Sequence, residues 1–280
     1  MNYIICWLTI LLFLISMISS LGASPSTSSD FSVNITMSSE TVENLKKTGF
    51  QLYGFKAVKN SGSNGVPLIW FATDEYLVNT TVEWSENYQA YISTQLNLTP
   101  YQVVKPCPLK ESFNASLARK DYRKYPMLAL VACSSESIEL GQEMFVDTYG
   151  NTKVTPNGND KEISILNESS QQWTCGISQA LLNPLKFNPL SAFPLYGRNK
   201  CTITPVKKVL LMFASYSLLK TGTVVNKSWG PSVLVDLTDV KSRDLTYDLN
   251  NGWSPTDQVW ANIVPVNTDI TSLLIQSQIL

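Results

Sequence analysis

Residues 210–215 read Leu-Leu-Met-Phe-Ala-Ser, and residues 68–73 read Leu-Ile-Trp-Phe-Ala-Thr. Both stretches place apolar side chains at successive positions, so both faces of an extended strand would be apolar. A strand that is apolar on both faces is typical of the centre of a packed sheet. The two stretches therefore predict two strands that are buried on both sides.

A second pair of matching segments precedes these two strands. Phe50-Gln51-Leu52-Tyr53-Gly54 is followed, at an offset of 143 residues (193 − 50), by Phe193-Pro194-Leu195-Tyr196-Gly197. Two shorter matches follow in the same order at an offset of 142: Thr81-Val82 with Thr223-Val224, and Tyr91-Ile92 with Val233-Leu234. We interpret residues 50–92 and 193–234 as an internal repeat. The predicted fold is all-β, a β-sandwich built from two sequence-related halves around a pseudo-twofold axis.

The remaining segments are assigned around this repeat. We expect a flexible spacer at 23–47, with a short helix over Glu40–Lys47 capped by Thr41. A single β-sandwich domain is expected at 48–262, followed by a C-terminal tail at 263–280. Residues 106–179 are an insertion between the repeats, with strands expected at 137–147, 162–166 and 172–177.

The N-terminus has the pattern of a secretory signal peptide. An apolar run from Tyr3 to Ile18 is followed by the small residues Ser19-Ser20-Leu21-Gly22-Ala23, which predicts cleavage near the end of residues 1–22. The alternative is an uncleaved signal anchor, because the run approaches the ~20 residues that span a bilayer. The favoured prediction is a secreted, extracellular protein.

The cysteine content agrees with an oxidising compartment. Apart from Cys6 in the predicted signal, the chain contains Cys107, Cys133, Cys175 and Cys201. Four cysteines allow three pairings, of which Cys107–Cys133 with Cys175–Cys201 is favoured here because it closes the shortest loops. A zinc site would need all four thiolates, since the chain has no histidine, so disulfides are the favoured reading.

N-glycosylation sequons support the same compartment. Six Asn-x-Ser/Thr motifs have no proline at the middle position and predict glycan attachment at the surface. They begin at Asn34, Asn79, Asn97, Asn114, Asn167 and Asn226.

Three motifs resemble a group of secreted fungal β-rich proteins. They are Leu52-Tyr53-Gly54-Phe55-Lys56-Ala57-Val58, Pro67-Leu68-Ile69-Trp70-Phe71 and Thr174-Cys175-Gly176-Ile177-Ser178-Gln179. The similarity covers most of residues 50–253. It implies a secreted fungal-type β protein and assigns a role to no residue.

Composition excludes several classes of function. The 280 residues carry 21 Lys and Arg against 22 Asp and Glu, a net charge of −1, which argues against a nucleic-acid partner. Without histidine, a Ser-His-Asp triad, a histidine zinc site and a histidine pH switch are all excluded. We expect no metal and no cofactor.

Two groups of aromatic residues are candidate ligand contacts. Trp253, Asp257 and Trp260 lie among turn residues, a setting that suits stacking on sugars or insertion at a membrane interface. Trp84 and Tyr88 form a second group. For both groups the alternative is ordinary packing in the core.

We expect a secreted, glycosylated protein that binds cell-surface or cell-wall carbohydrate rather than catalysing a reaction. The first alternative is a membrane-active, cytolysin-like protein. The second is a glycan hydrolase using carboxylates such as Asp74, Glu75, Glu83 and Glu86. The expected partner is an extracellular glycan or a host or cell surface. The sequence specifies no oligomeric state.

Overall fold

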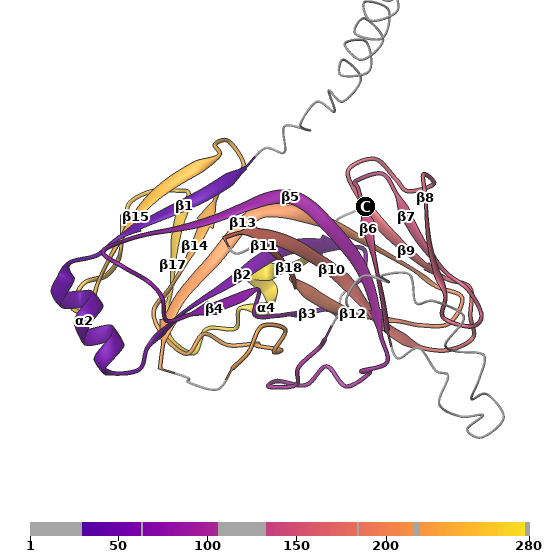
Figure 1. Ribbon diagram of the computed structural model, residues 1–280, viewed down its shortest axis with the longest axis horizontal. Helices are drawn as coiled ribbons and strands as arrows, with labels where there is room; N and C mark the ends of the chain where they lie inside the picture. The colour runs from indigo at the N-terminus through magenta and orange to yellow at the C-terminus, as the bar shows by residue number, and fades with distance from the viewer. Residues whose placement is uncertain (1–29, 63, 106–132, 184, 216–218, 278–280) are drawn as a thin grey trace, which may run out of the picture.

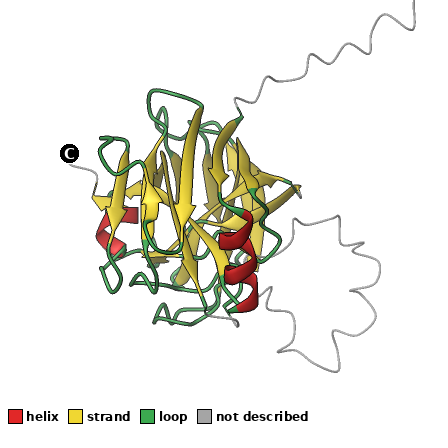
Figure 2. Cartoon of the chain, turned by 90° about the vertical axis from the view of Figure 1, so that its left-hand side faces the viewer, coloured by secondary structure: helices red, strands yellow, loops and turns green. Residues whose placement is uncertain are grey.

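The computed structural model describes residues 30–62, 64–105, 133–183, 185–215 and 219–277. These residues form a mostly β structure in which two curled mixed sheets, each a half-barrel, face each other (Figure 1). Figure 2 shows how little of the described chain is helical. No helix in the described ranges is both long and apolar enough to cross a membrane.

The first sheet has the order β16-β15-β1-β5-β10-β12-β3, with β11 beside β10 and β6 beside β5. β1 and β15 are parallel, whereas the other pairs are antiparallel. Its strands are β1 (Phe31–Thr36), β3 (Val66–Pro67), β5 (Asn79–Ser93), β6 (Cys133–Ile138), β10 (Trp173–Leu182), β11 (Leu185–Pro189), β12 (Ser191–Leu195), β15 (Ser242–Asp248) and β16 (Gly252–Ser254).

The second sheet has the order β17-β14-β13-β9-β7-β8, and β2 pairs with β13, β18 and β4. Its parallel pairs are β7 with β9 and β18 with β2. Its strands are β2 (Gln51–Asn60), β4 (Phe71–Thr73), β7 (Glu143–Val146), β8 (Thr152–Thr155), β9 (Ile163–Asn167), β13 (Lys200–Ala214), β14 (Ser232–Asp236), β17 (Ala261–Val264) and β18 (Ile275–Ser277).

The strand at 210–214 is buried on both faces, which confirms the prediction. Leu211 and Phe213 face the core between the sheets, whereas Leu210 and Met212 face a second core on the outer side of β13. Helix α4 (Thr271–Leu274) contributes Leu274 to this second core. Because α4 and its neighbours cover the outer face, β13 has no side exposed to solvent along these residues.

The matching stretch at 68–73 is buried but is not one continuous strand, so the prediction is wrong in part. Leu68 forms an isolated bridge with Val224, and only Phe71–Thr73 form β4. The ring of Phe71 lies where a side chain on Gly54 would be, so only glycine fits opposite it on β2. Two chain segments can approach this closely only where one lacks a Cβ.

The predicted N-terminal spacer is wrong for the part that the structure describes. β1 lies between β15 and β5, and its Val33 and Ile35 are fully buried. Polar and apolar residues alternate in Phe31–Thr36, so the apolar side chains all face the core. This pattern is too short to be recognised as a strand among the surrounding Ser and Thr residues.

The predicted short helix is confirmed as α2 (Ser39–Lys47). Its N-cap is Ser38 rather than Thr41, because the Ser38 hydroxyl accepts the backbone N–H of Thr41 at 3.0 Å.

The predicted C-terminal tail also needs correction, and the insertion is placed by the structure. After residue 263 the chain completes β17, forms α4 and adds β18 to β2. Strands in the insertion occur near the predicted positions, but they are integral to the fold: β10 lies next to β5 in the first sheet, and β9 next to β13 in the second. Hydrogen bonding to distant strands decides this placement.

Candidate functional site

Three of the predicted ligand-binding aromatic residues are core residues. Trp253, Trp84 and Tyr88 are 2%, 1% and 5% exposed, so the structure contradicts their role as surface contacts. Trp253 stacks on Phe213 and donates its indole N–H to the Pro231 carbonyl at 2.9 Å. The turn residues around it bring it to the end of the core, where burying the ring is more favourable than exposing it.

Trp260 and Asp257 lie nearer to solvent. Asp257 is exposed, and Trp260 is half-buried with the guanidinium of Arg243 4.5 Å from its ring. Arg243 also donates to the backbone carbonyl of Asp236 at 3.4 Å. Arg243 covers one face of the Trp260 indole, and core residues pack against another part of the ring. Trp260 therefore offers little free ring surface to a ligand.

An aromatic pair that the sequence reasoning missed lies at the surface. The rings of Tyr101 and Trp229 are stacked, 6.2 Å apart and inclined by 14°, and Trp229 meets the edge of Tyr53 beneath it. Tyr101 is 53% exposed and Trp229 is half-buried. We call this pair the Tyr101–Trp229 surface. The sequence feature that could have indicated this surface is the proline-containing turn beside each residue, Thr99-Pro100-Tyr101 and Trp229-Gly230-Pro231.

Tyr101 is held in an uncommon backbone conformation. Its φ is +70°, a left-handed value that costs a non-glycine residue energy. Its backbone N–H donates to the Val224 carbonyl at 2.9 Å, and Val224 donates in return to the Gln102 carbonyl at 2.8 Å. These two bonds fix the loop against the neighbouring segment, so the surrounding structure holds Tyr101 at the surface.

The sequons differ in exposure. Asn79, Asn97 and Asn226 are exposed, whereas Asn114 lies outside the described residues. Asn34 is half-buried in β1, and its amide nitrogen donates to Asp244 Oδ1 at 2.7 Å.

Asn167 is fully buried, so the predicted glycan at this sequon is contradicted. Its Nδ2 donates to the carbonyls of Gln171 and Tyr196 at 2.8 and 3.0 Å, and its Oδ1 accepts from Ser169. A glycan on Nδ2 would have to occupy space that these backbone groups fill.

We expect Asn167 to be unmodified when the protein is expressed through a eukaryotic secretory pathway. We expect Asn167→Ala to lower the free energy of unfolding by about 2–3 kcal/mol, since two buried carbonyls lose their donor. Glycopeptide mass spectrometry and denaturant unfolding measure the two effects. Asn226→Ala is the control, with a change within about 0.5 kcal/mol. A glycan found on Asn167 would contradict the assignment.

A buried lysine occupies the core between the sheets. Lys56 is 2% exposed, and its Nζ lies 4.2 Å from the ring centre of Trp84 and 5.6 Å from that of Trp70. Removal from water lowers the pKa of Lys56 to about 7; Glu86 opposes the shift and Lys207 adds to it. The two indole faces compensate part of the cost of burying a cation.

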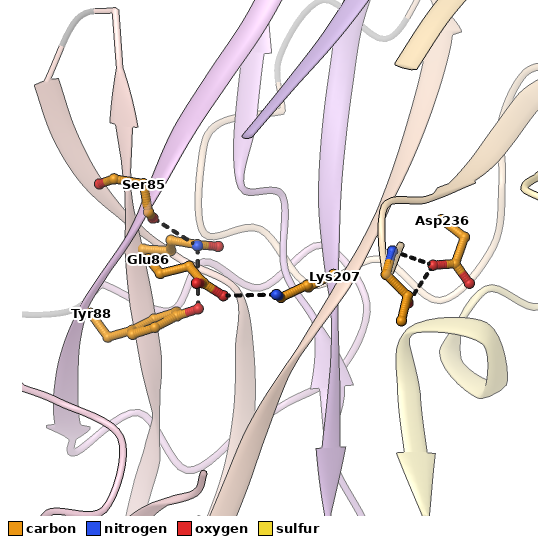
Figure 3. A network of polar contacts seen from close by, with 7 residues as sticks. Ser85, Glu86, Tyr88, Lys207 and Asp236 are labelled. Carbon is orange, nitrogen blue, oxygen red and sulfur yellow. Dashed lines mark hydrogen bonds and ion pairs between the residues drawn. The ribbon is translucent and has the colours of Figure 1, made fainter. Parts of the chain in front are cut away.

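A network of polar contacts links the two sheets (Figure 3), and two of its members, Glu86 and Lys207, affect the pKa of Lys56. Gln179 donates to the Ser85 carbonyl at 2.9 Å, and Glu86 on β5 forms an ion pair with Lys207 on β13 at 4.0 Å. The Oε1 atom of Gln179 is buried and accepts no hydrogen bond from any residue that the structure describes. This cluster links the two sheets. Gln179 is buried, and the side chains of Glu86 and Lys207, 31% and 44% exposed, are paired with each other, so we regard the cluster as structural.

The two described cysteine side chains lie together. Cys175 on β10 and Cys201 on β13 are buried free thiols. Burial, together with a hydrogen bond between them, raises the pKa of Cys175 well above its usual value. No disulfide is present at bonding distance in the described chain. Cys107 lies outside the described residues, so the other predicted pair is not described.

A cleft of about 580 Å³ opens between β4, the first half of β5 and the β10–β11 hairpin. Leu52, Phe71, Val82 and Leu181 contribute apolar surface to it. Of the carboxylates expected for hydrolysis, Asp74, Glu75 and Glu83 line this cleft, whereas Glu86 pairs with Lys207. Among the described residues, no group of three or more Cys, Asp or Glu side chains could hold a metal ion.

Comparison with known proteins gives no relative. No family model matches the chain, and neither a curated protein nor a solved structure is significantly similar to it.

Proposed function

We propose that this protein is a secreted carbohydrate-binding protein and that the Tyr101–Trp229 surface is its main contact with the sugar. The observation that carries the proposal is a stacked aromatic pair at the surface, in which Tyr101 is exposed, Trp229 is half-buried and backbone hydrogen bonds hold the Tyr101 loop in place. The apolar face of a sugar ring packs on an aromatic ring, and the adjacent polar groups can bond its hydroxyls.

Polar neighbours of this surface suit such a ligand. Gln102 follows Tyr101 directly and is exposed, and Lys227 is exposed on the segment that precedes Trp229. Backbone bonds join the 101–104 and 222–224 segments, so the aromatic and polar groups share a fixed frame. A preordered site loses little conformational entropy when a ligand binds.

Secretion is part of the same proposal. The predicted signal peptide and the alternative signal anchor both lie in residues 1–29, outside the described chain. The exposure of the Asn79, Asn97 and Asn226 sequons supports passage through a glycosylating compartment. The resemblance to secreted fungal β-rich proteins stays a prediction.

The pseudo-twofold relation between residues 50–92 and 193–234 also belongs to this proposal. One pairing between the two halves supports it: β2, which carries the first Leu-Tyr-Gly motif, pairs with the apolar strand of the second half, Leu52 opposite Phe213.

The test is binding to an array of cell-wall and cell-surface glycans. We expect at least one polysaccharide to bind, and Tyr101→Ala to weaken its affinity by about tenfold, which corresponds to about 1.4 kcal/mol. Tyr149→Ala is the matched control, because Tyr149 is 84% exposed on a different turn. Thermal melting checks that both variants fold.

Three results would count against the proposal. The first is an array without any hit, and the second is full binding by Tyr101→Ala. The third is leakage from lipid vesicles or release of reducing sugar in the absence of glycan binding, which would favour the membrane-active or hydrolytic alternative.

A further inference from the structure

Along residues 79–83, one edge of β5 lacks a partner strand among the described residues. Trp84 is the last residue of β5 with a partner on both edges: it pairs with Phe31 of β1 on one side and with Leu181 of β10 on the other. β1 continues along residues 79–83, but β10 ends at Leu182. In the described chain, the other edge of residues 79–83 therefore has no partner strand, and its backbone donors and acceptors are available for pairing.

The 580 Å³ cleft runs along this edge. Residues 79–83 all line it, although their side chains alternate between the exposed face (Asn79, Thr81, Glu83) and the inner face (Thr80, Val82). Successive side chains of a strand point to opposite faces, so a cleft that one face lined would contact only alternate residues. Because consecutive residues line this cleft, it faces the edge of the strand. Opposite lies β4, which pairs only with β2 among the described strands.

The cleft is also acidic. Asp74, Glu75 and Glu83 line it together with one cation, Lys186, a balance of 1 − 3 = −2. The ion pairs found in the described ranges are Lys200–Glu143, Lys207–Glu86 and Lys208–Asp236, so none of them uses these three carboxylates. The negative charge in the cleft is thus not balanced by ion pairing.

We propose that this cleft binds an extended polypeptide segment bearing Lys or Arg, which adds to β5 as a further strand. Only an extended polypeptide offers N–H and C=O groups at the spacing of a strand edge, and a cationic side chain matches the charge. Five residues of edge span about 17 Å, enough for a short strand. The Tyr101–Trp229 surface is a separate site, so this proposal does not depend on sugar binding.

The test uses fluorescence anisotropy with the full chain after endoglycosidase treatment, since Asn79 begins a sequon at the cleft. The probe is a labelled ten-residue peptide of alternating Lys and Thr. Two further peptides carry N-methyl groups on the odd or the even residues, and a fourth replaces Lys with Glu.

We expect the Lys-Thr peptide to bind, the Glu-Thr peptide not to bind, and at least one N-methylated peptide to bind about tenfold more weakly, because alternate N–H groups face the partner strand. The triple variant Asp74→Asn, Glu75→Gln, Glu83→Gln should also bind more weakly. Glu139→Gln, an exposed carboxylate outside the cleft, should bind as the original chain does.

Failure of the Lys-Thr peptide to bind would overturn the proposal. Equal affinity of both N-methylated peptides would also overturn it, because binding would then rest on charge alone. Binding that the triple variant retains in full would place the peptide elsewhere on the molecule.

Discussion

Replacing Lys56 with Met is expected to stabilise the protein at neutral pH and to remove a rise in stability between pH 6.5 and 8.5. In the folded protein the pKa of Lys56 is about 7, because the side chain is buried between the sheets. In the unfolded chain its pKa is close to 10.4. Between these values the unfolded chain binds more protons than the folded protein, so stability increases with pH.

The size of this effect follows from the two pKa values. Stability from Lys56 should increase by roughly 2 kcal/mol between pH 6.5 and 8.5. The window is unusually clear, since the chain contains no histidine to titrate within it. Above this window the raised pKa of Cys175 acts in the opposite direction, because the folded protein then retains a proton that the unfolded chain loses.

Urea unfolding of the two proteins at pH 6.5 and 8.5 measures the difference. Lys59→Met is the matched control, because Lys59 lies on the same strand with its side chain exposed. It should change stability by no more than about 0.5 kcal/mol, with no altered pH dependence. Equal pH dependence in Lys56→Met and the original chain would show that Lys56 does not carry the effect.

Oxidation of Cys175 and Cys201 to a disulfide is expected to raise the free energy of unfolding by about 3 to 4 kcal/mol. Their bond would close a loop of 26 residues (201 − 175), and constraining such a loop lowers the entropy of the unfolded chain. Each thiol gives up a proton, and two electrons pass to a thiol–disulfide oxidant. The bond would join β10 to β13 and so link the two sheets covalently.

Two measurements test this expectation. Peptide mapping of the non-reduced protein, expressed with export through an oxidising compartment, should recover residues 175 and 201 in one disulfide-linked fragment. The melting temperature should fall by about 10 °C on reduction. In the variant Cys175→Ala, Cys201→Ala the reductant should no longer lower it by this amount. Recovery of both cysteines as free thiols from protein expressed in this way would contradict the prediction.

Local pattern predicted much of the fold. Successive apolar side chains at 210–214 indicated a strand buried on both sides, and the acidic start and basic end of Ser39–Lys47 are typical of a helix. Short β-branched and aromatic runs placed strands in the insertion. These features depend on neighbouring residues, which is why the sequence reveals them.

The candidate sites were predicted far less well, for a physical reason. Trp253 lies among turn residues, as an exposed tryptophan would, yet Phe213 and Tyr247 approach it from other strands and bury it. Asn167 has an intact sequon, but its side-chain nitrogen is buried and donates a hydrogen bond to the carbonyl of Tyr196. Exposure is decided by segments far away in the sequence, which leave no local trace.

The amino-acid sequence by itself determined the mostly β character, the position of the doubly buried strand, and a chemistry without histidine and almost without net charge. Only the tertiary structure decided which aromatic residues reach the surface, that Lys56 lies in the core, and that β5 keeps an unpaired edge beside an acidic cleft. The division arises because side-chain pattern is set along the chain, whereas burial and strand pairing depend on residues that meet only after folding.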